Sequence, residues 1–382
     1  MFKNYKISKN EYCPCGSGKR YKTCCYNRED KRYHPNQIEA LPSKYLKKSI
    51  FKTCLYPNNN ECSENIIGAH ALQNNRILSK LSVDNHVIMM NFLKKPLCFD
   101  VKHEKLQLNL FDKVGVNKAT KYPCFCKKHD DEVFADIEKD GCSFTTGNVK
   151  QEFLFAYKAF VFEYYINQVK NNQFELLIKD IPSNLKDTIF INKYRRLVKD
   201  KRSLEKYKLK FDTALINRNY KTIKTNIMEL NEEIKFANFC CITPKYNLDG
   251  RRLRLYNRVD KIDRKIFITI FPSDKKSYVL ISYLKDEYKY IKKFIDGITS
   301  CDISYVKFYL NSILPIYSDN IVLSPKLWEN WEDENRIAFD YYNNLNGHED
   351  IILMGISFML KNSHRAKKET IDYCSSKINL FE

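Results

Sequence analysis

The chain has 382 residues, of which 43% are hydrophobic, so it can form two or three domains with buried cores. It contains only 10 glycines, and this low number argues against a glycine-rich nucleotide-binding loop. Its formal net charge of +19 favours polyanionic partners: nucleic acid, an anionic membrane face or an acidic protein. The first residues contain no apolar core of a signal peptide, and no stretch reaches the roughly 18 apolar residues of a membrane span. We therefore predict a cytoplasmic protein with reduced thiols, and its Lys, Asn, Ile and Tyr content is typical of an AT-rich bacterial genome.

The first segment with distinctive chemistry is CPCGSGKRYKTCC, which contains two closely spaced cysteine pairs. Cys13 and Cys15 are separated by one residue and Cys24 and Cys25 are adjacent, and neither spacing suits a disulfide within a pair. Zinc prefers four thiolates in a tetrahedron, and two such pairs joined by a turn provide them. The spacing predicts a closed zinc site that leaves no open position for a substrate.

This segment resembles the SEC-C motif, whose pattern is Cys-x-Cys, eight residues, and then Cys-Cys or Cys-His. The resemblance implies zinc binding and a docking module for a protein partner rather than a catalytic site. Such knuckles are attached to many unrelated proteins, so the resemblance assigns no function to the rest of the chain. We interpret residues 1–30 as a SEC-C zinc knuckle.

Residues 50–145 contain a second cysteine and histidine set. Cys54 and Cys62 lie on either side of a Pro-Asn-Asn-Asn turn, and Cys126 and His129 open a segment with helical apolar spacing. Three cysteines and one histidine are a common zinc ligand set. We therefore predict a second zinc site, giving two zinc ions per chain. The alternative is a set of buried cysteines and surface histidines without metal.

Residues 54–138 also resemble HNH-type and treble-clef zinc fingers. The resemblance implies that His70, which follows the short apolar stretch NIIGA, acts as a general base beside a bound Mg²⁺ or Mn²⁺. Asn85 or His86 would then be the middle residue that orients the loop. Active members carry an acidic residue just before the first histidine, where this chain has Ala69.

Three interpretations of this region stay open. In the first interpretation, Asp130 or Asp131 substitutes for the missing acid, and the protein is an HNH-like endonuclease. In the second interpretation, which we favour, the zinc fold is structural and has no catalysis. In the third, His70 is itself a zinc ligand, and Cys62 or Cys124 is outside the ligand set.

Residues 150–240 predict a helical region with a basic face. Residues 151–172 are apolar on most sides, which indicates a buried helix, and 184–236 have the apolar spacing of two antiparallel helices that turn at 217–219. Lysines, arginines and interleaved tyrosines occupy the exposed side, a pattern that favours sequence-independent contact with phosphates, although a solvated face is the common alternative. The nucleic-acid contacts that we predict are Arg195, Arg196, Lys199, Lys201 and Arg202, with a second patch at Arg251, Arg252 and Arg254.

Residues 241–382 predict an α+β domain without a recognisable catalytic motif. We expect a hairpin at 265–284, a helix that stops at Gly297, a helix near 303–314, and a short strand before a helix capped by Ser324 and Pro325 and ending at Gly347.

The predicted fold class is α+β and helix-rich: a small N-terminal zinc knuckle, a second zinc-stabilised finger region, a central helical region and an α+β C-terminal domain. We predict a cytoplasmic bacterial zinc-binding protein that associates with nucleic acid through its basic helical surface, in phage or mobile-element defence. The alternatives are a metal-dependent HNH-like nuclease with His70 as general base, and a SEC-C docking adaptor without catalysis.

Overall fold

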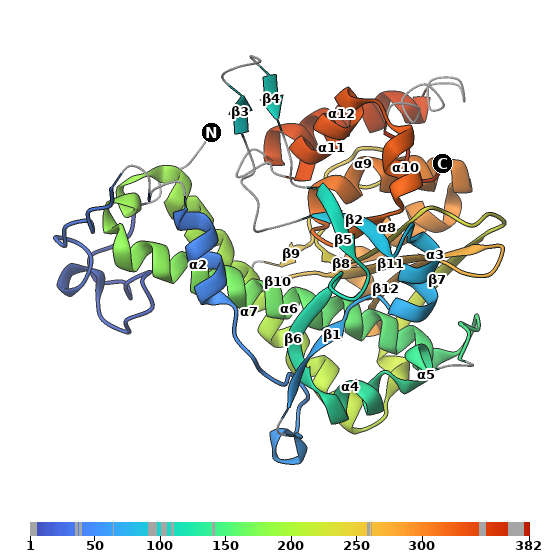
Figure 1. Cartoon of the computed structure of the whole chain (residues 1–382), viewed down its shortest axis with the longest axis horizontal. Helices are drawn as coiled ribbons and strands as arrows, with labels where there is room; N and C mark the ends of the chain where they lie inside the picture. The colour runs from blue at the N-terminus through green and yellow to red at the C-terminus, as the bar shows by residue number, and fades with distance from the viewer. Residues whose placement is uncertain are drawn as a thin grey trace. The chain divides into compact units, whose positions relative to one another are not determined.

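The computed structural model describes residues 6–34, 37, 40–63, 65–90, 98–100, 105–107, 111–139, 142–257, 260, 262–343, 349–365 and 378–382. The chain forms two compact units (Figure 1). Unit 1 comprises Met1–Lys52 and Tyr164–Lys208, and unit 2 comprises Thr53–Glu163 and Leu209–Glu382. Helices and sheets together confirm the helix-rich α+β class. The finer domain boundaries 1–30, 50–145, 150–240 and 241–382 stay a prediction.

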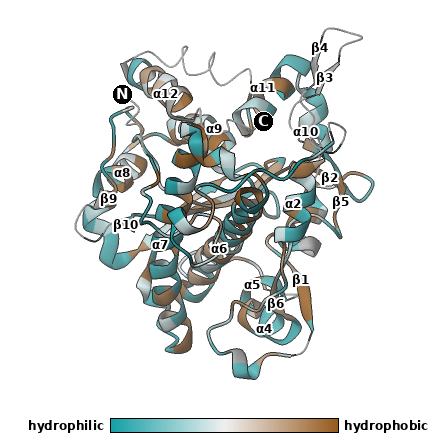
Figure 2. Ribbon diagram, turned by 90° about the vertical axis from the view of Figure 1, so that its left-hand side faces the viewer, coloured by the Kyte–Doolittle hydropathy of each residue, from teal (hydrophilic) through white to brown (hydrophobic). Residues whose placement is uncertain are grey.

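Unit 1 packs the cysteine segment against parts of two long helices. Its elements are η1 (Tyr21–Thr23), α2 (Leu41–Ser49), the end of α6 (Val149–Asp180), η4 (Pro182–Lys186) and the beginning of α7 (Thr188–Ile216). Figure 2 shows hydrophilic and hydrophobic residues along α7, as expected of an amphipathic helix. The apolar cluster joins the segment to both helices through Tyr21, Cys25, Phe174, Ile178, Ile191 and Leu197.

Polar contacts hold the same parts of unit 1 together. The guanidinium of Arg28 donates to the carbonyl oxygen of Ile178 at 3.1 Å. The hydroxyl of Tyr45 donates to the carboxylate of Asp180 at 3.0 Å. Because these bonds link the N-terminal segment to the end of α6, the segment is supported by residues more than a hundred positions away in the sequence.

Unit 2 is organised around a seven-stranded antiparallel sheet with the order β5-β2-β13-β8-β11-β12-β7. Its strands are β2 (His86–Met90), β5 (Phe111–Gly115), β7 (Ile223–Leu230), β8 (Phe236–Ile242), β11 (Ile266–Pro272), β12 (Ser277–Leu284) and β13 (Ile321–Leu323). The helices that follow in the chain are η6 (Lys285–Glu287), α8 (Tyr288–Ser300), α9 (Ile303–Tyr317), α10 (Pro325–Asn330), α11 (Asp333–Asn343) and α12 (Glu349–Arg365).

Strand β11 shows that the sheet is covered on both faces. Its even-numbered residues join the core that contains α8 and α9: Ile266, Ile268 and Ile270. On the other face, Phe267 and Phe271 contact Phe160 and Phe155 of α6, with ring centroids 6.2 and 5.0 Å apart. Since alternate residues of a strand point to opposite faces, every residue of this strand is buried, and all but Thr269 are apolar.

Shorter elements complete unit 2. Antiparallel pairs form between β1 (Ile66–His70) and β6 (Lys121–Cys126), β3 (Cys98–Asp100) and β4 (Lys105–Gln107), and β9 (Tyr256–Asn257) and β10 (Ile262–Asp263). The remaining helical turns are η2 (Asn59–Glu61), η3 (Asn74–Leu78), α3 (Ser79–Leu81), α4 (Lys127–Val133), α5 (Ala135–Glu138) and η5 (Tyr220–Thr222). No helix in the described part of the chain combines the length and apolar character needed to cross a bilayer.

Several predicted elements are confirmed and others are wrong. The hairpin at 265–284 forms as β11 and β12, and α10 begins at Pro325 after Ser324. The helix expected after residue 219 is instead the edge strand β7, whose backbone bonds to β12 replace helical ones. Gly297 does not end α8, which continues to Ser300, and the last expected helix is interrupted after Asn330.

A glycine fixes the loop before β9 against α12. Gly250 has a φ of +72°, and a Cβ added there would lie 2.3 Å from the backbone oxygen of Ser357. The Ser357 hydroxyl also donates to the carbonyl oxygen of Gly250 at 2.7 Å. Gly147, also in unit 2, has a φ of +87° but open space around its Cα.

We therefore expect Gly250→Ala to destabilise unit 2 more than Gly147→Ala. Both substitutions place a Cβ at positive φ, which costs about 1–2 kcal/mol. Gly250→Ala adds overpacking against a helix backbone, for a total of about 2–5 kcal/mol. Urea unfolding followed by circular dichroism measures both, and equal losses of unfolding free energy would contradict the close approach of the loop to α12.

Candidate metal centres

The first candidate centre is formed by the four cysteines of the N-terminal segment. The sulfur atoms of Cys13, Cys15, Cys24 and Cys25 lie within 4.8 Å of one another. The Sγ atom of Cys24 is 3.5 Å from that of Cys15 and 3.9 Å from that of Cys25. A disulfide has a length of about 2.05 Å, whereas a tetrahedron with Zn–S bonds of about 2.3 Å has S···S edges of about 3.8 Å. The group could therefore hold a metal ion and is compatible with zinc.

A tight loop brings these sulfur atoms together. The amide of Cys13 donates to the carbonyl oxygen of Lys19 at 2.8 Å, and the amide of Gly16 donates to that of Cys13 at 3.2 Å. Gly16 and Gly18 both have a φ of +72°, which glycine adopts without strain. The hydroxyl of Ser17 lies 3.2 Å from the Sγ atom of Cys24, so a polar group also stands beside the sulfur cluster.

The second candidate centre joins three cysteines and a histidine. Ligand atoms of Cys54, Cys62, Cys126 and His129 lie within 4.8 Å of one another. The Nδ1 atom of His129 is 3.4, 3.6 and 3.2 Å from the sulfur atoms of Cys54, Cys62 and Cys126, respectively. A zinc tetrahedron has S···N edges of about 3.6 Å. This group could also hold a metal ion, and its donor set is likewise compatible with zinc.

Two elements and an extended segment position the second centre. Strand β6 ends at Cys126, and α4 then places His129 in its first turn. The amides of Thr53 and Leu55 donate to the backbone of β6 at 3.1 and 2.9 Å, which holds Cys54 beside that strand. The ring of Tyr56 stacks on His129 with a centroid distance of 3.8 Å, so the imidazole is fixed from the side.

Hydrogen bonds prepare one thiol in each centre for deprotonation. Burial raises the pKa of Cys15, but hydrogen bonds from Ser17 and Cys13 outweigh it and lower the pKa to about 7. Burial likewise raises the pKa of Cys126, while bonds from His129 and Ser63 lower it to about 7. Since the thiolate is the metal ligand, each centre has a cysteine that is partly ionised at neutral pH.

The long gap between Cys62 and Cys126 has a structural explanation. Residues 71–120 leave the β1–β6 pair and contribute β2 and β5 to the large sheet. The chain then returns to β6, where Cys126 is opposite Ile66 of β1. The second centre is therefore a local finger with a long excursion into the sheet of the same unit.

His70 is outside the second ligand group. It is at the end of β1 opposite Lys121, four residues from Ile66, which corresponds to about 13 Å along a strand. Cys124 is also outside the group: it is fully buried, which raises the pKa of its thiol well above the ordinary value. The alternative in which His70 replaces a cysteine ligand does not fit this geometry, because the strand carries His70 away from the sulfur atoms.

His70 nevertheless has a defined tautomer. Its Nδ1 atom is 3.1 Å from the carbonyl oxygen of Ala119, so that nitrogen carries the proton and Nε2 is a free acceptor. Burial, with the positive charges of Lys121 and Lys158, lowers its pKa to about 4. The imidazole is therefore neutral at pH 7, and the charges that help to lower its pKa are those of Lys121 and Lys158.

Four residues are predicted to act with His70: Asp130, Asp131, Asn85 and His86. Asp130 is buried, and desolvation raises the pKa of its carboxyl group. Asp131 is exposed on α4. Asn85 lies in the turn before β2 and His86 is the first residue of that strand, where its Nδ1 atom contacts the carbonyl oxygen of Asp84 at 2.6 Å. The catalytic role of His70 and of these residues stays a prediction.

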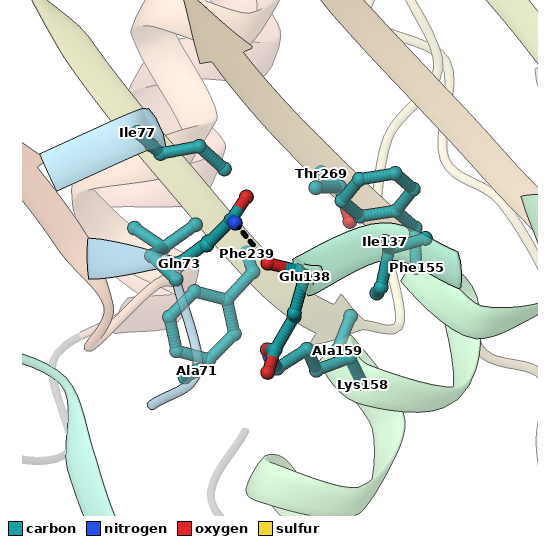
Figure 3. Close-up of a pocket in the computed structure, with 11 residues that line it drawn as sticks. Ala71, Gln73, Ile77, Ile137, Glu138, Phe155, Lys158, Ala159, Phe239 and Thr269 are labelled. Atoms are coloured by element: carbon teal, nitrogen blue, oxygen red, sulfur yellow. Dashed lines mark hydrogen bonds and ion pairs between the residues drawn. The ribbon is translucent and has the colours of Figure 1, made fainter. Parts of the chain in front are cut away.

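A small cavity lies beside the segment that follows His70 (Figure 3). Lys158 and Glu138 form a buried ion pair on its wall, and the amide of Gln73 donates to the backbone oxygen of Glu138. Burial lowers the pKa of Lys158 to about 8. The cavity volume of about 10 Å³ is at the lower limit for one water molecule, so this space holds no substrate.

The predicted nucleic-acid residues fall into two separate groups. Arg195 forms an ion pair with Glu11 at 2.6 Å in unit 1. Its helix α7 also exposes Arg196, Lys199, Lys201 and Arg202. Arg251, Arg252 and Arg254 belong instead to the loop before β9 in unit 2, where Arg251 pairs with Asp249 at 3.1 Å.

Comparison with known families identifies the N-terminal segment. Residues 10–27 match the family model of the SEC-C motif, which confirms the resemblance over this segment. Comparison with curated proteins found no match, and comparison with solved structures found none either.

We expect two zinc ions per wild-type chain and one in Cys126→Ser. The matched control is Cys124→Ser, two residues earlier on the same strand and also buried, which retains both ions because Cys124 lies outside the ligand group. Elemental analysis after desalting gives the stoichiometry. Loss of an ion from both variants would mean that zinc responds to damage of β6 rather than to removal of a ligand.

Proposed function

We propose that the protein binds zinc at both centres and holds nucleic acid on unit 1. The distribution of charge is the observation that supports this proposal. Unit 1 contains 24 Lys and Arg against 9 Asp and Glu, a formal charge of +15, whereas unit 2 contains 41 against 37, a charge of +4. About four fifths of the excess charge of the chain, +15 of +19, thus belongs to the 97 residues that include the cysteine segment.

Zinc leaves this charge largely intact. Zn²⁺ with four thiolates has a formal charge of −2, so a loaded first centre reduces the charge of unit 1 to about +13. Lysine and arginine at this density attract phosphates without reading base sequence, and the resulting affinity falls steeply with salt. The substrate class that fits unit 1 is therefore a nucleic acid bound through its backbone.

Packing within unit 1 favours this proposal over the docking adaptor. The apolar side of the cysteine segment, including Tyr21 and Cys25, is covered by Phe174 and Ile178 of α6. The side that stays exposed carries Lys9, Lys19, Arg20 and Lys22. A protein partner that needs an apolar contact would have to displace the chain's own helix, whereas a phosphate backbone would meet the basic side directly.

The cellular setting is part of the same proposal. None of the twelve cysteines whose side chains the structure describes forms a disulfide, which fits a reducing compartment such as the cytoplasm. A role in phage or mobile-element defence stays a prediction, since the geometry of neither unit bears on it.

We expect Lys201→Ala/Arg202→Ala to weaken binding to a generic DNA duplex and to reduce the slope of log K against log salt by about 2. These two cations are exposed on α7 in unit 1. The matched control is Arg251→Ala/Arg252→Ala in unit 2, which should leave the slope unchanged. Fluorescence anisotropy at several salt concentrations measures both variants.

Two outcomes would contradict the proposal. If both double variants reduced the salt dependence equally, unit 1 would not be the main nucleic-acid binding surface. If the protein bound anionic vesicles but no nucleic acid, its ligand would be a lipid surface rather than a phosphate backbone.

A nuclease is the second candidate function, and the fixed tautomer of His70 favours it. With Nδ1 bonded to the backbone, the Nε2 atom is available to accept a proton from water. The charges that shift the pKa of this histidine come from Lys121 and Lys158, however, and a catalytic Mg²⁺ needs oxygen ligands. We therefore favour nucleic-acid binding without cleavage over nuclease activity.

We expect the zinc-loaded protein to leave supercoiled plasmid intact with Mg²⁺ or Mn²⁺. The physical reason is that positive charge around His70 opposes a second cation there. Agarose gels detect nicking of one strand. Nicking that disappears in His70→Ala but persists in His34→Ala, an exposed histidine of unit 1, would establish the nuclease instead.

A further inference from the structure

The exposed side of the cysteine segment carries an aromatic ring that solvent reaches. Tyr12 precedes the first cysteine and is 62% exposed. The guanidinium carbon of Arg20 lies over its ring, 4.4 Å from the centroid. The neighbouring aromatic residue Tyr21 is buried in the apolar cluster. The exposed ring is thus paired with a cation rather than with the core of unit 1.

Backbone contacts hold this pair in place. Tyr12 and Arg20 face each other in an antiparallel β-bridge. The guanidinium of Arg20 also donates to the carbonyl oxygen of Asn10 at 2.7 Å, which orients its plane. A ring and a guanidinium that are already ordered lose little conformational entropy when a ligand stacks on them.

The surroundings of the pair are basic. Lys19 and Lys22 flank Arg20 in the sequence and are exposed. A second pair of the same kind lies in the segment, where the ammonium of Lys9 is 4.5 Å from the ring centroid of Tyr26. Aromatic faces interleaved with cations are the surface on which unpaired bases stack while their phosphates meet lysine and arginine.

We propose that the Tyr12–Arg20 pair is a stacking platform for an unpaired base, so that unit 1 prefers single-stranded to double-stranded nucleic acid. This inference rests on the proposed function, because the phosphate contacts of unit 1 bring the strand to the ring. In a duplex the bases are stacked on one another, so their faces do not reach Tyr12. A single strand offers them freely.

The test compares an unstructured single-stranded oligonucleotide with a duplex of the same length, using the zinc-loaded full chain and fluorescence anisotropy. We expect wild type to prefer the single strand. Tyr12→Ala should weaken single-strand binding about 10-fold and leave duplex binding unchanged. Tyr12→Phe retains the ring and should behave as wild type. The matched control is Tyr341→Ala, which removes an exposed tyrosine from unit 2 and should have no effect.

A second measurement distinguishes loss of stacking from misfolding of a variant. Tyr12→Trp places an indole at the platform, and its emission should be quenched by the single strand but not by the duplex, relative to the parent protein. Zinc content reports whether each variant keeps its first centre. Unchanged emission of a zinc-loaded Tyr12→Trp variant would overturn the stacking platform.

The outcomes separate this inference from the function on which it rests. Salt-dependent binding of both nucleic acids with no effect of Tyr12→Ala would overturn the platform and leave the proposed function standing. Absence of binding to either nucleic acid would overturn both.

Discussion

Unit 1 depends on the contact between its cysteine segment and the long helices α6 and α7. Thirteen residues are too few to bury a core of their own, so such a segment needs metal, neighbouring side chains or both. Here Phe174 and Ile178 supply the apolar partner, and Arg28 fixes the segment to the end of α6. The contact decides which side of the segment is left for solvent, and that side is basic and carries Tyr12.

The sequence predicts the parts of this fold that local patterns determine. The β11–β12 hairpin follows from two β-branched runs around a polar turn. Strand β7 is missed because Ile223, Ile227 and Leu230 fit a helical spacing as well as an edge strand, and only pairing with β12 decides between the two. The order of the seven strands is a nonlocal property, since β2 and β5 come from the excursion between β1 and β6.

The two candidate centres differ in the same way. The first is readable from the spacing of four cysteines within one loop. The second centre brings Cys54 and His129 together although a segment of about fifty residues that joins the large sheet lies between them in the sequence. The sequence indicates this ligand set only through the residue types, cysteine and histidine, that zinc prefers. The stacking of Tyr56 on His129 and the pairing of Tyr12 with Arg20 escape sequence reasoning, because neither contact follows from a periodic pattern.

The distance in sequence between the cysteine segment and its supporting helix has a consequence for synthesis on the ribosome. Cys25 and Ile178 are in contact but are 153 residues apart. At about 5–20 residues per second, the segment waits roughly 8 to 30 s before that helix is made. During this interval its thiols have no apolar cover from α6. Metal bound by the four cysteines in this interval would shield the thiols before α6 covers them.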